Sequence, residues 1–364
     1  MVRVKHDGIR GLLKEASIKS LICFGAGRHF NTVMELYAPW KLEHYVEFII
    51  DNNIKLADSK KVYKDKEFEV KPIGVLQEYT NKEIVILITC HLASMDIVEQ
   101  LDSINELDGT SVYIGSFLSD ELNKKFEYLM PDAGQIKIPK VIHYCWFGNT
   151  DIPQEYRNFI STWKIHCPDY QVKRWDESNF DISQNEYMRE AYKKKRWAFV
   201  SDYARIKILY DHGGIYLDCD VELCKSLDDF LTADFFCGFE DQNHINLGLG
   251  FGAVAGHRYL KELLDIYDKL KFVDRDGNLN ETPCIAYQTT AAGRLGVKAE
   301  NTYQKIDGMY VYPTEIFSPI SPWGMGNKTS NSYSVHHYTA SWQKNENKKG
   351  IQNVYQRYYQ RIKE

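Results

Sequence analysis

The chain has 364 residues, a formal net charge of −5 and 44% hydrophobic residues. This length suffices for two domains of ordinary size, and the composition can build hydrophobic cores. The negative charge disfavours a general nucleic-acid-binding protein. We find no run of 18 apolar residues and no secretory signal, so we expect no transmembrane segment. The eight cysteines form no Cys-x-x-Cys pair, which indicates reduced thiols in a cytoplasmic protein.

The first 135 residues alternate apolar runs with segments of helical character. This alternation predicts a parallel α/β sheet. We expect its strands in the apolar runs at 17–24, 45–51, 84–89 and 112–117.

A glycine turn, Gly25-Ala26-Gly27, ends the first of these runs. Asp51 follows about 20 residues later, which is part of the pattern of a dinucleotide-binding fold. Phe30 stands in place of the third glycine, which puts the tight helix–strand packing of a dehydrogenase in doubt. The segments FGAGRHF and FIIDNN resemble the Rossmann-like domains found beside sugar-modifying and acyl-transferring enzymes of polysaccharide synthesis. Two roles of this domain are equally weighted. It could bind a nucleotide, with backbone N–H groups on a phosphate, or it could have a purely structural or assembly role.

The segment LMPDAGQIKIPK separates this part from the rest of the chain. Pro131, Gly134 and Pro139 interrupt the helical periodicity there. We therefore expect a first domain at 1–136 and a second at 137–364.

The chain is organised around residues 198–222, AFVSDYARIKILYDHGGIYLDCDVE. Apolar side chains at spacings of three and four predict a helix with a buried stripe in the first half. Gly213 and Gly214 follow where a left-handed C-terminal cap is expected, because glycine enters that conformation without steric cost. Asp202 and Arg205 lie within one turn of each other, and on their own they would be a surface ion pair.

The end of this stretch predicts a cation site. We expect a strand at 215–221 whose alternation places Tyr216, Asp218 and Asp220 on one face. Neighbouring carboxylates repel each other, and a divalent cation such as Mg²⁺ or Mn²⁺ removes the repulsion. A bare Asp-x-Asp is common, so an ordinary polar strand end is the alternative.

The segment SDYARIKILYDHGGIYLDCDV resembles the central motif of the glycosyltransferases with a DXD-containing sugar-binding region. That group includes bacterial capsule and lipopolysaccharide enzymes, yeast mannosyltransferases and the glucosylating domains of large clostridial toxins. The pattern S-D-x-x-R followed by G-G-x-Y-L-D-x-D is matched at every defining position. The resemblance covers about 137–343, and it implies metal-dependent transfer of a sugar from a nucleotide diphosphate donor with retention at the anomeric carbon.

Two other segments resemble parts of the same group. IPKVIHYCWFGN, at 138–149, is similar to the opening strand, in which a tryptophan near the turn stacks on the nucleotide base. Trp146 matches that position, and a core tryptophan is the alternative. INLGLGFGA contains Asn246, which matches an asparagine close to the sugar, with a simple turn asparagine weighted equally.

A third segment, SVHHYTASWQ at 334–343, resembles the one with which capsule-type members close their active site. A histidine there can bind the metal from the side opposite the Asp-x-Asp pair. We choose His337 and keep His336 as the fallback, since one of two adjacent strand residues must face away. Ser341 and Trp342 would cover the diphosphate.

The resemblance thus implies a complete site. The catalytic residues are Asp202, Arg205, Asp218 and Asn246. The donor-binding residues are Trp146, Asp202, Arg205, Tyr216, Ser341 and Trp342. The metal ligands are Asp218, Asp220 and His337, and the cofactor is Mn²⁺ or Mg²⁺.

We therefore expect an α/β protein with an N-terminal Rossmann-like domain followed by a GT-A type glycosyltransferase domain. It would move a sugar from a nucleotide sugar, UDP-linked, to a saccharide or glycolipid acceptor in capsule, lipopolysaccharide or related polysaccharide synthesis. We expect no nucleic-acid partner and a cytoplasmic protein, with peripheral association at the inner face of the membrane left open. The alternatives are a catalytically inactive nucleotide-sugar-binding or assembly protein, and an oxidoreductase or epimerase centred on the glycine turn.

Overall fold

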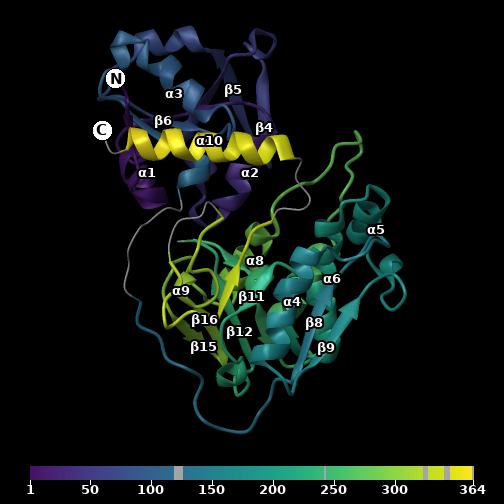
Figure 1. Cartoon of the computed structure of the whole chain (residues 1–364). Helices are drawn as coiled ribbons and strands as arrows, with labels where there is room; N and C mark the ends of the chain where they lie inside the picture. The colour runs from purple at the N-terminus through teal and green to yellow at the C-terminus, as the bar shows by residue number, and fades with distance from the viewer. Residues whose placement is uncertain (119–125, 242, 323–326, 340–344, 363–364) are drawn as a thin grey trace. The chain divides into compact units, whose positions relative to one another are not determined.

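The computed structural model describes residues 1–118, 126–241, 243–322, 327–339 and 345–362 (Figure 1). The chain forms two compact units. The first comprises Met1–Leu122 together with Gln343–Glu364, and the second comprises Asn123–Trp342.

The first unit is built on one seven-stranded sheet. Its strands are β1 (Arg3–Val4), β2 (Ser20–Phe24), β3 (Val46–Asp51), β4 (Lys60–Tyr63), β5 (Lys66–Pro72), β6 (Ile84–Ile88) and β7 (Ser111–Ile114). In the order β1-β7-β6-β2-β3-β5-β4, all neighbours are parallel except β4 and β5. The four strands predicted for this part are present as β2, β3, β6 and β7, and β6 is buried along its whole length, as expected of a covered parallel sheet.

The helices of this unit include one from the end of the chain. They are α1 (Gly8–Ala16), α2 (Arg28–Leu36), α3 (Ser94–Asp102) and α10 (Asn345–Arg361). Arg357 of α10 lies 2.7 Å from Asp96 of α3, and Arg361 lies 2.9 Å from Asp102. We expected 137–364 to form one domain. Instead α10, yellow in Figure 1, packs on α3 of the first unit, because its arginines and tyrosines find partners there.

The second unit contains a mixed sheet of eight strands and a separate two-stranded sheet. The large sheet consists of β8 (Val141–Cys145), β9 (Gln171–Trp175), β10 (Gly214–Tyr216), β12 (Phe235–Phe239), β13 (Ile245–Asn246), β14 (Phe251–Ala253), β15 (Gln304–Ile306) and β16 (Met309–Tyr312). Its order is β15-β16-β12-β14-β10-β8-β9, with β13 on β12. The small sheet pairs β11 (Val221–Leu223) with β17 (Ser334–His336) in antiparallel fashion.

Hydrophobic cores form on both faces of the large sheet. The helices of this unit are α4 (Gln154–His166), α5 (Glu186–Lys193), α6 (Trp197–His212), α7 (Arg258–Tyr267), α8 (Cys284–Arg294) and α9 (Thr314–Phe317). Phe235 packs into the core formed with α6 and α7, whereas its neighbour Phe236 packs into the opposite core with Trp163 of α4. The unit is therefore a mixed α/β fold. Within the described residues, no helix is both long enough and apolar enough to span a membrane.

The burial of Tyr358 gives a test of the place of α10. This tyrosine is sealed from solvent, and its ring stacks on Phe117 with 3.8 Å between centroids. We expect Tyr358→Ala to lower the stability of the first unit by about 3 kcal/mol, since removing a buried ring leaves a cavity. Chemical unfolding, monitored by hydrogen exchange of the β2 and β6 amides, measures this change in the free energy of unfolding. Gln356→Ala, on the exposed side of the same helix, is the control, and equal stability in the two variants would contradict the assignment.

Candidate functional site

The two aspartates of the D-x-D motif lie in a turn and not along a strand. The strand expected at 215–221 ends at Tyr216, and the N–H of Val221 closes the turn by bonding to the carbonyl of Asp218 at 3.1 Å. This prediction was wrong because a tight turn, which brings both carboxylates to one place, can follow directly after a short strand. The turn leads into β11, which carries the chain toward β17.

The preceding connection from α6 into β10 requires glycine twice. Gly213 and Gly214 have φ angles of 64° and 102°, in the range that favours glycine. A Cβ on Gly214 would lie 2.8 Å from both His143 Nε2 and the carbonyl of Val141. The helix can therefore pass directly into the sheet. Glycine is required there as predicted, but Gly213 has a ψ angle of −168° and is not in the left-handed helical conformation expected of the cap.

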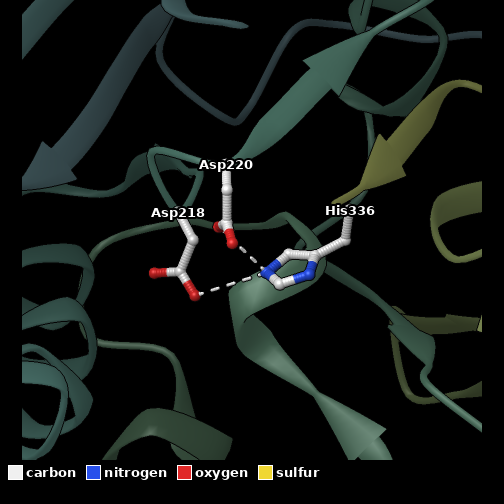
Figure 2. Close-up of side chains that lie close together, drawn as sticks. All are labelled: Asp218, Asp220 and His336. Carbon is white, nitrogen blue, oxygen red and sulfur yellow. Dashed lines mark ion pairs between the residues drawn. The ribbon is translucent and has the colours of Figure 1, made fainter. Parts of the chain in front are cut away.

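Asp218, Asp220 and His336 form a cluster, shown in Figure 2. His336 Nε2 lies 3.3 Å from Asp220 Oδ1 and 3.8 Å from Asp218 Oδ2. Nε2 is buried and, among the residues that the structure describes, finds no hydrogen-bond partner of ordinary geometry. Two carboxylate oxygens and an imidazole nitrogen are a suitable donor set for a divalent cation, so the residues present fit such an ion.

The histidine of this cluster is His336, and the choice of His337 was wrong. His337 Nε2 lies 2.9 Å from Glu222 Oε2, and its ring stacks on Phe159 at 4.2 Å. In the register of the small sheet, His336 is opposite Val221, directly after the turn. Adjacent strand residues point to opposite faces, so placing His336 toward the aspartates turns His337 away.

Each aspartate is oriented through the oxygen that faces away from the cluster. Asp220 Oδ2 accepts hydrogen bonds from both the N–H and the hydroxyl of Thr339, each at 2.9 Å. Asp218 Oδ1 accepts from the hydroxyl of Tyr216 at 2.9 Å. The remaining oxygens, Asp218 Oδ2 and Asp220 Oδ1, face His336. Partners of this kind fix ligand orientation around metal ions.

Tyr216, which was assigned to donor binding, is 1% exposed, and its hydroxyl bonds to Asp218. Its ring lies 5.3 Å from the guanidinium of Arg205. Tyr216 thus supports Asp218, and its role in donor binding stays a prediction.

Asp202 and Arg205 form a buried pair and not a surface one. Arg205 Nη2 lies 2.8 Å from Asp202 Oδ1 and 3.5 Å from Asp218 Oδ1. Burial raises the pKa of Asp202 to about 6, against the opposing effect of Arg205. Burial also acts to raise the pKa of Asp218, but Arg205 and His336 outweigh it and hold that pKa below its usual value. The arginine therefore keeps the D-x-D carboxylate ionised.

Asn246 lies next to this network. Its Oδ1 accepts from the N–H of Gly248 at 2.6 Å, and its amide donates to Glu240 Oε2. A Cβ on Gly248 would lie 2.3 Å from Asp218 Oδ2 and 3.0 Å from both Arg205 Nη1 and Asn246 Oδ1. Gly248 thus leaves room at a point where polar groups from α6, the D-x-D turn and β13 meet. Glu240 and Gly248 were not singled out from the sequence, because only their position in the fold connects them to the aspartates.

Trp146 lies in the loop after β8 and is half-buried. Its Nε1 donates to the carbonyl of Thr150 at 2.9 Å, and its ring is 5.4 Å from that of Tyr156. The hydroxyl of Tyr156 bonds to Thr339 at 2.8 Å, which connects this loop to Asp220. The position is open enough for a contact with a base, so that role stays a prediction. Ser341 and Trp342 lie outside the described residues.

The glycine turn of the first unit is closed within the protein. Asp51 Oδ2 accepts from the N–H of Ala26 at 2.7 Å, and Oδ1 accepts from the N–H of Asn53 at 2.8 Å. Asp51, which would bind a ribose, thus bonds to the N–H of Ala26, which would bind a phosphate. A cleft of about 260 Å³ beside the turn is lined by Gly25, Asp51 and Asp96, among other residues. Its acids disfavour a phosphate, so the turn gives no support to the oxidoreductase alternative.

Comparison with known proteins identifies the region around the cluster. Residues 153–236 match the family model described as glycosyltransferase sugar-binding region containing DXD motif. This region, which contains the D-x-D turn, is therefore similar to the sugar-binding region of these glycosyltransferases. The resemblance recognised in the sequence is confirmed, and the similarity supports a glycosyltransferase enzyme.

The individual relatives of this chain have low sequence identity to it. An uncharacterised glycosyltransferase of Acanthamoeba polyphaga mimivirus is 29% identical over 191 residues, which cover 50% of this chain and 75% of the viral protein. Inositol phosphoceramide mannosyltransferase 3 of Schizosaccharomyces pombe is 34% identical over 131 residues, covering 35% of this chain and 36% of the yeast protein. Among solved structures, the PaToxG glycosyltransferase aligns with a TM-score of 0.36 and 17% identity, over 43% of this chain and 68% of its own.

The contact above Gly248 gives a test of the site geometry. We expect Gly248→Ala to reduce sugar-donor hydrolysis about a hundredfold, because the new methyl group displaces Asp218 Oδ2 from its place beside His336. Gly293→Ala, at an exposed helical position whose Cβ would meet nothing within 4 Å, is the matched control and should keep full activity. Wild-type activity in a folded Gly248→Ala protein would mean that Asp218 is not needed where the structure places it.

Proposed function

We propose that this protein is a metal-dependent, retaining glycosyltransferase of the GT-A type. It moves a sugar from a nucleotide diphosphate sugar, UDP-linked, to a hydroxyl of a saccharide or glycolipid acceptor. The reaction serves capsule, lipopolysaccharide or related polysaccharide synthesis in the cytoplasm, with peripheral contact to the inner face of the membrane. The first unit is a Rossmann-like domain for assembly or acceptor choice. The observation that carries the proposal is the convergence of one atom each of Asp218, Asp220 and His336. Both aspartates belong to residues 153–236, which match the DXD sugar-binding model.

Mn²⁺ or Mg²⁺ suits this donor set. When bound, the cation supplies positive charge that stabilises the leaving diphosphate. Coordination through His336 Nε2 requires the ring proton to be on Nδ1. Since the N–H of Tyr338 lies 3.2 Å from Nδ1, that contact has to open when Nε2 becomes a ligand.

The other polar groups of the site divide the remaining work. Arg205 is a fixed positive charge beside Asp218 and adds to the stabilisation of the leaving group. Asp202, oriented by Arg205, accepts hydrogen bonds from donor hydroxyls. Asn246 lies near the transferred sugar, and Trp146 stacks on the base.

Retention follows from attack on the face from which the phosphate departs. The bond between the anomeric carbon and the phosphate oxygen breaks, and a bond to the acceptor oxygen forms. The acceptor proton passes to the departing phosphate oxygen, so no side chain is needed as a base. We favour this route because no pair of carboxylates stands out in the sequence as the acid and nucleophile of a glycosidase.

The names of two relatives support the acceptor class. The yeast proteins are inositol phosphoceramide mannosyltransferases, which matches a glycolipid acceptor. This chain spans about a third of their length. Their acceptor is therefore one member of the panel to be tested.

The direct experiment is a screen of nucleotide sugars for release of nucleotide diphosphate in Mn²⁺ and in chelator. The proposal expects one donor to be hydrolysed only with the divalent cation. Donor binding without hydrolysis or transfer to any acceptor would favour the inactive sugar-binding protein instead. Absence of both binding and hydrolysis across the panel would contradict the proposal.

The two adjacent histidines provide a sharp internal comparison. We expect His336→Ala to reduce Mn²⁺-dependent donor hydrolysis about a hundredfold, because a ligand of the cation is lost. His337→Ala is the matched control: it removes a contact with Glu222 on the opposite face and should keep activity within a few fold. Rates measured at increasing Mn²⁺ separate lost metal affinity from lost chemistry. The reverse order of effects would restore His337 as the ligand.

A further inference from the structure

Glu240 is a carboxylate near the site that the proposed roles leave unused. It follows β12 directly and is half-buried, and its N–H bonds to the carbonyl of His244 at 2.8 Å. Its Oε2 accepts a hydrogen bond from the amide of Asn246. Within the part of the chain that the structure describes, no donor bonds to its other oxygen, Oε1, which is not sealed from solvent. One oxygen is thus committed to the protein and the other is available.

The link through Asn246 places this carboxylate close to the cation cluster. Asn246 Oδ1 and Asp218 Oδ2 flank the same point above Gly248, at 3.0 and 2.3 Å from a Cβ placed there. Burial raises the pKa of Glu240, and the hydrogen bond from Asn246 and the charge of His336 oppose that rise. Glu240 therefore lies next to Asn246, at the edge of the cation cluster.

The chemistry of a carboxylate limits what it can bind there. Carboxylate oxygens accept hydrogen bonds from hydroxyl or N–H groups and repel phosphate oxygens. The diphosphate group is therefore excluded as the partner of Oε1. Ring hydroxyls of the transferred sugar can donate to it, and so can the ribose hydroxyls and base N–H groups of the nucleotide. We take the sugar as the partner because Oε2 is bonded to Asn246, which is proposed to lie near the transferred sugar.

We propose that Glu240 recognises the transferred sugar, with Oε1 accepting a ring hydroxyl while Oε2 holds the Asn246 amide in place. This inference rests on the proposed function, because it takes a nucleotide sugar as the ligand. It makes Glu240 a specificity-determining residue. A site built to bond a hydroxyl rejects the analogue that lacks it, since the polar group is then left without a partner.

The test compares the affinity for the whole donor with that for its nucleotide part. UDP-glucose and UDP, and separately GDP-mannose and GDP, are titrated calorimetrically in Mn²⁺ into the full chain. Glu240→Gln preserves the size of the side chain and an acceptor for Asn246. We expect it to weaken binding of the cognate nucleotide sugar about tenfold, because a charge-assisted hydrogen bond is lost, and to leave the affinity for the free nucleotide within twofold.

Glu315→Gln is the matched control. Glu315 is also half-buried in this unit, and its Oε1 accepts from the hydroxyl of Thr329 at 2.7 Å and the amide of Asn331 at 3.1 Å. It should leave the ratio of the two affinities unchanged. Glu240→Asp, which withdraws the charge by one methylene, should repeat the selective loss and covers the case in which Glu240→Gln does not fold.

Two outcomes would overturn the assignment of Glu240. One is an equal loss of affinity for nucleotide and nucleotide sugar, which would mean a contact with the nucleotide itself or a structural role through Asn246. The other is no loss for either ligand. A wild-type protein that binds neither nucleotide nor nucleotide sugar in Mn²⁺ would overturn the proposed function itself, and a nucleotide-only binder would overturn this inference alone.

Discussion

The buried guanidinium of Arg205 is the interaction on which the site depends. It lies 2.8 Å from Asp202 and 3.5 Å from Asp218, and the ring of Tyr216 is 5.3 Å from it. A charge withdrawn from water in this way needs its partners, and removing one member of such a network typically costs about 3–5 kcal/mol. The network therefore ties the D-x-D turn to helix α6. Because Arg205 and Tyr216 take one oxygen of Asp218, only the other oxygen remains for a ligand.

The same principle orients the rest of the cluster. Thr339 takes one oxygen of Asp220, which leaves the second toward His336. The backbone contributes as well, since Gly248 leaves room where a methyl group would meet Asp218. Dipoles and charges arranged before the substrate arrives require little reorganisation during the reaction. The site owes this preorganisation to residues far apart in sequence, which the sheet of the second unit and the β11–β17 pair bring together.

The sequence predicts the parts of this arrangement that are local. The helix before Gly213, the glycine turn and the four strands of the first unit follow from periodicity and glycine chemistry. The choice of His337 over His336 was wrong because it depends on the register between β11 and β17, which is a tertiary contact. For the same reason Glu240 was missed, since a hydrogen bond to Asn246 in the folded protein links it to the site. The place of α10 was also beyond reach, because an amphipathic helix does not specify which of two units it covers.

We propose that the D-x-D turn and His336 hold a divalent cation jointly with a nucleotide diphosphate. The protein offers three ligand atoms there, whereas Mg²⁺ or Mn²⁺ usually takes about six. Cation and nucleotide should therefore raise each other's affinity by the same factor. Calorimetric titration of UDP into the protein, with and without Mn²⁺, measures this factor directly. We expect UDP to bind at least about tenfold more tightly with Mn²⁺. Equal affinities in the two titrations would contradict joint binding of cation and nucleotide.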